Sequence, residues 1–303
     1  MAHHEHNHSH SHSHAHNKNK KALAISFVLI ASFMVIEFIG GFLTNSLALI
    51  SDAGHMLSDA VALGLSLSAL IFGAKAADSK KTYGYKRYEI LAALLNGIVL
   101  VVLSAFILKE AIVRLSEPVT VVGKGMMIIS VIGLIINIIV AWILSRGEAK
   151  DNLNVRSAFM HVIGDLLGSV GAIIAAVLII LFGWNIADPI ASIIVSLLVL
   201  YSGWNILKDA FNILMEGKPS NIDSDKLTES LNDIPQVVGV HDLHIWMITS
   251  EFPALTVHLC VECEADRDKI LETAIKVIKE KTGIKHITVQ IEGRKLKLDE
   301  EIC

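Results

Sequence analysis

Long apolar stretches, each about the length of a membrane-spanning helix, follow one another through the first two-thirds of the chain. An α-helix needs roughly 20 mainly apolar residues to cross a bilayer. Six segments meet this requirement: residues 22–43, 47–73, 88–113, 120–145, 156–182 and 188–212. The pattern therefore predicts an all-α membrane domain, a six-helix bundle, in residues 22–215.

The pattern changes after about residue 216, where shorter amphipathic and alternating segments begin. Periodicity predicts a helix, two strands, a second helix and a third strand, in residues 222–234, 237–249, 253–263, 266–282 and 285–292. An αββαβ order is typical of a small α+β layer with its helices on one face of the sheet. We therefore expect residues 216–303 to form a ferredoxin-like cytoplasmic domain.

Residues 1–21 are polar and hold eight of the 14 histidines. Such a tract cannot bury a core, so we expect a disordered tail. A cloning tag is one interpretation, but serine, asparagine and alanine alternate with histidine here, whereas tags are commonly unbroken runs. We favour weak capture of metal ions, with no cleavable signal peptide at this end.

Charge decides the orientation and excludes some functions. Lysine and arginine gather before the first span, between spans 2 and 3 and between spans 4 and 5, whereas residues 43–50 and 183–188 hold none. The positive-inside rule then places both termini in the cytoplasm of a multi-pass cell-membrane protein.

A net charge of −4 argues against nucleic-acid binding. We find no Walker A motif and no H-E-x-x-H motif, so neither ATP hydrolysis nor a metalloprotease is indicated, and we do not expect an enzyme.

Two copies of the pattern His-x-x-x-Asp lie inside predicted membrane helices: His55 with Asp59, and His161 with Asp165. An aspartate at the bilayer centre costs about 3 kcal/mol, so a residue kept there needs a partner or a task. Positions i and i+4 share one helix face. Two such pairs facing each other supply two nitrogens and two oxygens, a set suited to tetrahedral zinc. Hydrogen-bonded couples that fix helix packing, or a proton relay, remain as alternatives.

Other polar residues in the spans have less specific roles. Glu37 is either a hydrogen-bonding group between helices or part of a water-filled entry path, and Asn137 is expected to join helices. Asp52 is expected to cap the start of its helix. Glycine, alanine and serine gather beside both metal-ligand patterns, which would let those two helices approach closely.

The cysteines and the basic connection after span 2 receive ordinary interpretations. Cys260 and Cys263 lie three apart in an alternating strand, so their side chains should face opposite sides, and we expect reduced thiols. The sequence KKTYGYKRYE is expected to anchor at lipid headgroups, with Lys86 and Arg87 facing anionic lipid.

The motifs HMLSD at 55–59, HVIGD at 161–165 and VVGVHDLHIW at 237–246, together with six spans, resemble the zinc-transporting branch of the cation diffusion facilitator family. The likeness covers nearly everything after the histidine tract. It implies a homodimer in the lipid bilayer that exports divalent metal in exchange for protons, with zinc as substrate and cadmium or cobalt as seconds. It also implies that His55, Asp59, His161 and Asp165 form the transport site between the second and fifth helices.

The same resemblance implies a metal site in the cytoplasmic domain, with zinc as a regulatory ion held by His241, His258 and Glu292. Gln290 stands where some members have histidine, which counts against a two-metal cluster. His244 and His286 are expected to be surface or packing residues. No other cofactor is expected.

Metal and proton should compete for the same atoms, because zinc requires neutral imidazole and ionised carboxylate. This competition supports secondary active antiport. A channel and a membrane-bound metal sensor are the alternatives, and both are separated from a transporter by flux measurements.

Overall fold

The computed structural model describes the backbone of residues 11–72, 78–145 and 153–293. Within those ranges, the side chains of residues 11–23, 62, 65–72, 144–145, 153–165 and 167 lie outside the described set. The chain divides into two compact units. We call Met1–Gly84 with Ala92–Leu207 the helical unit, and Tyr85–Leu91 with Lys208–Cys303 the sheet unit.

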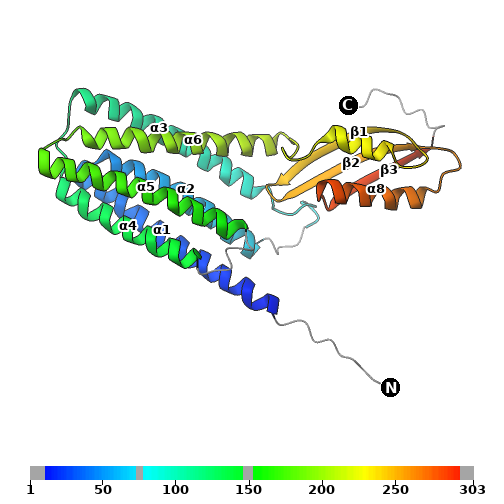
Figure 1. Cartoon of the computed structure of the whole chain (residues 1–303), viewed down its shortest axis with the longest axis horizontal. Coiled ribbons are helices and arrows are strands. Elements are labelled where there is room, and N and C mark those ends of the chain that lie inside the picture. The colour runs from blue at the N-terminus through cyan, green and yellow to red at the C-terminus, as the bar shows by residue number, and fades with distance from the viewer. Residues whose placement is uncertain (1–10, 73–77, 146–152, 294–303) are drawn as a thin grey trace, which may run out of the picture. The chain divides into compact units, whose positions relative to one another are not determined.

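Six long helices occupy the places that hydropathy predicts (Figure 1). Their bounds are α1 Ser11–Thr44, α2 Leu47–Phe72, α3 Tyr88–Ser116, α4 Gly123–Ser145, α5 Leu153–Phe182 and α6 Ala187–Leu214. Among the described residues, four segments are long and apolar enough to span a membrane: Ala24–Thr44, Tyr88–Ser116, Gly123–Ile143 and Ala187–Leu214. This is a multi-pass membrane protein.

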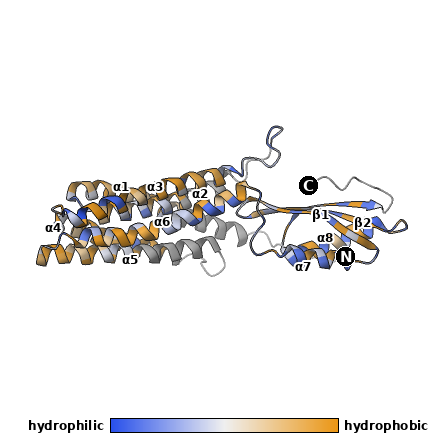
Figure 2. Cartoon of the chain, turned by 90° about the horizontal axis from the view of Figure 1, so that it is seen from above, coloured by the Kyte–Doolittle hydropathy of each residue, from blue (hydrophilic) through white to orange (hydrophobic). Residues whose placement is uncertain are grey.

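Hydrophobic residues predominate along these helices (Figure 2), and their side chains lie on the outside as well as at the contacts between helices. Only 28% to 33% of each spanning window is buried. Phe106, Leu181 and Leu198 are more than half exposed, as are many similar residues. An apolar exterior of this extent is what lipid requires, because a soluble protein rarely exposes large apolar patches.

Close packing joins α2 to its neighbours within the helical unit. One buried cluster joins Phe33 of α1, Met56 of α2 and Val140 of α4. A second joins Leu49 of α2 to a run of alanines on α5 that includes Ala172. Alanines of α5 therefore line a close contact with α2, although they are not the small residues expected beside the two ligand motifs.

Two expectations about helix starts need correction. The tract 11–21, expected to be disordered, continues α1, which begins at Ser11, and this tract contains neither proline nor glycine to end a helix. Asp52 does not cap α2, because it lies a turn inside the helix. Ser46 and Asp188 take that role: Ser46 Oγ accepts from Leu49 N, and the Asp188 carboxylate accepts from the first two backbone N–H groups of α2 at 2.8 and 3.2 Å.

The sheet unit contains the predicted αββαβ order: α7 Ser224–Asn232, β1 Val237–Thr249, β2 Phe252–Val261, α8 Arg267–Thr282 and β3 His286–Gly293. The strands lie in the order β1-β2-β3, with β1 and β2 antiparallel and β2 and β3 parallel. Alternate residues of β2 from Leu255 to Val261 pack with α7 and α8 on one face of the sheet. Figure 2 shows both helices along that face. His258 therefore belongs to the opposite face.

A β-bulge in β1 changes which residues face the helices. His241 pairs with His258, but His244 pairs with Thr256, so β1 contains one residue more than β2 in this interval. Asp242, at the bulge, has φ 55°, a left-handed conformation that is uncommon outside glycine, asparagine and aspartate. The bulge lets Val240, Leu243 and Ile245 all pack against the same core, although their spacing is not that of a regular strand.

The basic connection before α3 packs within the sheet unit. The ammonium of Lys86 lies 3.8 Å from the centre of the Phe252 ring, and Ser250 Oγ donates to Glu89 at 3.0 Å. Arg87 is paired with Glu216 at 3.3 Å. Both cations thus have protein partners. Both residues are also exposed, so the expected contact with anionic lipid stays a prediction.

Candidate functional site

The first predicted ligand pair lies on α2 inside the helical unit. Asp59 is buried, with 6% of its surface exposed, and His55 is partly buried one turn earlier. His161 and Asp165 belong to the helical backbone of α5, but their side chains lie outside the described residues. Their geometry as ligands thus stays a prediction.

The described part of α5 fixes how α2 and α5 lie against each other. A Cβ placed on Gly168 would stand 2.7 Å from Oδ1 of Asp52, so the Asp52 carboxylate occupies space that only a glycine of α5 leaves open. Earlier residues of α2, Ala48 and Leu49, pack with later residues of α5, including Ala172. The two helices are therefore neighbours and run antiparallel.

Two more polar residues of the spans are buried. Glu37 of α1 is 1% exposed and Asn137 of α4 is 2% exposed. Asn137 Nδ2 donates to Ser169 Oγ of α5 at 3.4 Å, which fits the expected role in joining helices.

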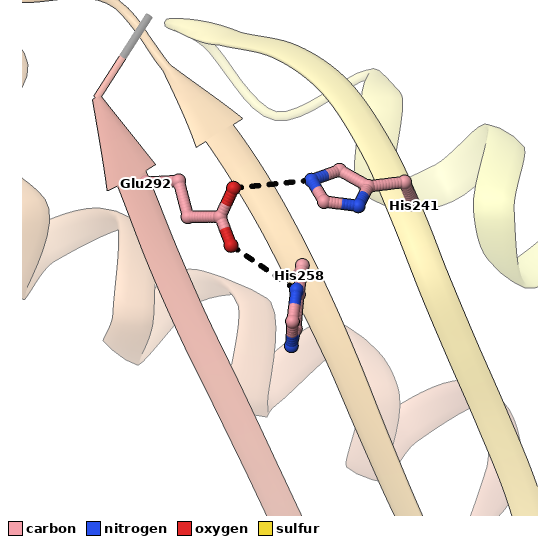
Figure 3. Close-up of side chains that lie close together, drawn as sticks. All are labelled: His241, His258 and Glu292. Atoms are coloured by element: carbon pink, nitrogen blue, oxygen red, sulfur yellow. Dashed lines mark hydrogen bonds and ion pairs between the residues drawn. The ribbon is translucent and has the colours of Figure 1, made fainter. Parts of the chain in front are cut away.

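A second group of ligand-type side chains lies on the face of the sheet away from α7 and α8. Glu292 of β3 has its carboxylate between two imidazoles (Figure 3). Its Oε2 lies 3.2 Å from Nε2 of His241, and its Oε1 lies 3.1 Å from Nδ1 of His258. Of the residues that the structure describes, these form the group of three whose ligand atoms all lie within 4.8 Å of one another.

Neighbouring strands bring the three residues together. His241 and His258 are paired across β1 and β2, and their rings meet edge to face with centroids 5.2 Å apart. Glu292 pairs with Cys260, which lies two residues after His258 on β2. Glu292 is 5% exposed, whereas His241 is open to solvent on one side. An ion could reach the group from that side, and two nitrogens with one carboxylate suit zinc.

Gln290 takes a supporting position. Its Nε2 donates to Oε1 of Glu292 at 2.7 Å, which fixes the orientation of the carboxylate. Because an uncharged amide stands at this place, the side chain holds a ligand in position but adds no strong ligand of its own.

The remaining candidates lie at the edge of this group or away from it. His244 Nε2 lies 2.9 Å from Oδ1 of Asp242, and the His286 ring packs against Phe252 with centroids 5.8 Å apart. Cys260 and Cys263 are free thiols, and Cys263 lies beyond the end of β2 and is exposed.

Sequence reasoning missed two residues beside these groups. Asp242 also lies near His258, with Oδ2 3.5 Å from Nε2 of that ring. The break in apolar alternation at Val240, Leu243 and Ile245 was the available signal of a bulge there. Gly168 is one of the small residues beside the second ligand motif, and nothing in the sequence pairs it with Asp52.

Comparisons with known proteins agree over nearly the whole chain. The model of the cation efflux transmembrane domain matches residues 23–215, and that of the cation efflux cytoplasmic domain matches residues 219–294. The cadmium, cobalt and zinc/H(+)-K(+) antiporter of Bacillus subtilis is 52% identical over 274 residues, which are 89% of this chain and 88% of the antiporter.

Further relatives carry similar names. The zinc transporter ZitB of Escherichia coli is 46% identical over 271 residues, 89% of this chain and 86% of ZitB. The metal cation efflux system protein CzcD of Cupriavidus metallidurans is 40% identical over 272 residues, again 89% and 86%. A solved metal-bound C-terminal domain of a CzcD transporter is 30% identical and covers 23% of this chain and 99% of its own, with a TM-score of 0.23.

Proposed function

This chain belongs to the cation efflux family of membrane metal transporters, and we propose that it exports zinc from the cytoplasm in exchange for protons. The resemblance found from the His-x-x-x-Asp motifs is thereby confirmed, and the relatives are named transporters rather than enzymes. Cadmium and cobalt are the secondary substrates, as the name of the Bacillus subtilis relative suggests. The transport site is the set His55, Asp59, His161 and Asp165.

The contact between Asp52 and Gly168 is the observation that carries this site. In an antiparallel pair, a step toward the C-terminus of α2 is matched by a step toward the N-terminus of α5. His55 comes three residues after Asp52, and Asp165 comes three before Gly168. These two positions therefore lie level with each other.

The second ligand pair follows from the same alignment. Asp59 comes seven residues after Asp52, and His161 comes seven before Gly168. Offsets of three, four and seven residues keep to one helix face. Asp52, His55 and Asp59 thus share the face of α2 that meets α5, and positions 161, 165 and 168 share one face of α5.

Chemistry then favours zinc and protons as the exchanged ions. Two imidazoles and two carboxylates form a four-coordinate set that matches zinc in number and type. Zinc binds neutral imidazole and ionised carboxylate, so protonation of these groups releases it. Export requires that the inward-open and outward-open conformations differ in relative affinity for metal and proton.

Metal flux in reconstituted vesicles tests the site. Vesicles loaded with a zinc-sensitive dye should fill when the wild-type protein is present, and Asp59→Asn or Asp165→Asn should abolish filling. The exposed residue Asp268 on α8 offers a control, since Asp268→Asn removes the same charge in the sheet unit, whereas the four ligands belong to the helical unit. Zinc binding without flux in the wild type would instead favour the membrane-bound sensor.

Proton coupling needs a separate measurement. Zinc uptake should accelerate under an imposed proton gradient, at fixed membrane potential and in potassium-free medium. A second series with potassium reveals any part that this ion plays. Equal uptake with and without the proton gradient, in both series, would reject antiport with protons.

The rest of the proposal concerns organisation. We infer six membrane spans, cytoplasmic termini and a homodimer, with a tail at 1–21, a membrane domain at 22–215 and a ferredoxin-like cytoplasmic domain at 216–303. The family model that matches the last domain bears the name ZT_dimer, which supports dimerisation. His241, His258 and Glu292 would hold a regulatory zinc ion in that domain, in accord with their donor set and mutual distances.

A further inference from the structure

The His258 imidazole lies between two carboxylates. Its Nδ1 is 3.1 Å from Glu292, and its Nε2 is 3.5 Å from Oδ2 of Asp242. Asp242 does not belong to the group of three ligand atoms that gather within 4.8 Å. The two carboxylates therefore have different places relative to the proposed ion, although both face the same ring.

A neutral imidazole binds a metal ion through one ring nitrogen and keeps a proton on the other. The side that faces Glu292 also has His241 within reach, so an ion bound there gains three protein ligands. The opposite nitrogen then keeps its proton and requires an acceptor. In metal sites, a carboxylate commonly takes this proton, fixes the ring and raises the basicity of the ligating nitrogen.

The backbone places Asp242 for such a role. The bulge between His241 and His244 gives Asp242 a left-handed φ of 55°, and its second oxygen lies 2.9 Å from Nε2 of His244. Bulges commonly redirect a side chain beside a functional site, and an aspartate held in this conformation carries local strain. Neither the sequence motifs nor the names of the relatives assign this residue a role.

We propose that Asp242 is a positioning residue of the cytoplasmic metal site. Its carboxylate accepts the Nε2 proton of His258 and so presents Nδ1 of that ring to a divalent cation shared with Glu292 and His241. Asp242 does not bind the ion. This inference rests on the proposed metal site of the cytoplasmic domain.

Zinc titration of the full-length protein in detergent, in competition with a chelating dye, tests the proposal. The full-length protein also offers zinc ligands in the histidine tract and in the membrane helices. We therefore assign to the cytoplasmic site only the part of zinc binding that Glu292→Gln removes, and we call this part the binding component. Asp242→Gly keeps the left-handed backbone and removes the carboxylate. It should weaken that component about 10- to 100-fold. Asp242→Asn, which keeps the shape and a weaker acceptor, should give a smaller loss. Asp268→Asn should give none.

Substitutions of His258 show which ring nitrogen of this residue binds the zinc ion. An asparagine side chain places its polar atoms near the position of Nδ1, whereas a glutamine reaches the position of Nε2. His258→Asn should therefore keep part of the component and His258→Gln should lose it. Adding Asp242→Gly to His258→Asn should change nothing further, because the ring it orients is gone.

The outcomes separate the two claims. If Glu292→Gln leaves zinc binding unchanged, the cytoplasmic site itself is wrong. If that variant loses a component but Asp242→Gly binds zinc as the wild type does, the site stands and the role of Asp242 is refuted. Retention of binding by His258→Gln and its loss in His258→Asn would also refute it, because Nε2 would then be the ligand.

Discussion

Replacing Gly168 with alanine tests the contact on which the transport site depends. The new Cβ would lie 2.7 Å from Oδ1 and 3.5 Å from Cγ of Asp52. Ordinary contact begins near 3.4 Å, so the carboxylate or the helix must shift by about 0.7 Å. Asp52 is 3% exposed, which leaves it little room to move. Overpacking of this kind costs about 1–3 kcal/mol.

Strain at this point should reach the ligands, because His55 and Asp165 lie one turn away on the same two helices. If the whole 1–3 kcal/mol opposes the zinc-bound geometry, affinity falls roughly 5- to 150-fold, since about 1.4 kcal/mol is a factor of ten. We expect zinc uptake into dye-loaded vesicles at low zinc to fall about tenfold. Higher zinc concentrations should restore part of the rate.

Gly171→Ala is the matched control. It makes the same change on the same helix, but a Cβ at Gly171 has no atom within 4 Å. The gain in helix propensity, about 1 kcal/mol in each variant, cancels in the comparison. Equal uptake by Gly168→Ala and Gly171→Ala would refute the contact with Asp52. The alignment of His55 with Asp165 would then lose its support.

Three further predictions concern stability. Asp188→Ala should lower the thermal midpoint of the detergent-solubilised protein, because three buried donors at the start of α2 lose their acceptor, at about 1–3 kcal/mol each; an unchanged midpoint would contradict this. Leu231→Ala should destabilise the sheet unit by about 2–5 kcal/mol in urea unfolding, whereas Val238→Ala, on an exposed side chain, should have little effect. A hydrogen bond from the Lys226 backbone holds the pKa of Asp223 below its ordinary 3.8, so this cap stabilises α7 above that pH and its contribution is lost as pH falls through the lowered pKa. Asp223→Asn should remove that part of the pH dependence, and a profile unaltered by the substitution would show that ionisation of Asp223 does not contribute to it.

The helices were predictable because their signal is local. A run of apolar residues long enough to span a membrane fixes a helix whatever it packs against, and the bounds of α3 and α5 fall within three residues of the predicted ones. The residue that caps α2 is distant in sequence. The Asp188 carboxylate accepts a hydrogen bond from the backbone N–H of Leu47, 141 residues away. Asp52 was the predicted cap only because it is near the helix start in sequence.

The cytoplasmic group shows a different limit. Alternation predicted the three strands, but it could not show that β3 lies parallel beside β2, which brings Glu292 to His258. Those residues were named from the family resemblance alone. The bulge at Asp242 inserts one residue into β1 and reverses the faces of the positions that follow. A strict period of two would have assigned His244 to the core side.

Both proposed sites depend on a backbone feature that brings a carboxylate close to another element. At Gly168, the absence of a side chain admits Asp52 between two helices. At the bulge of β1, a left-handed φ turns the Asp242 carboxylate toward His258. Substitutions that keep every metal ligand should therefore still alter zinc binding when they change these two backbone features. A ligand set read from sequence motifs gives the chemistry of a site, whereas its geometry depends on such positions, where the side chain is missing or the chain departs from regular structure.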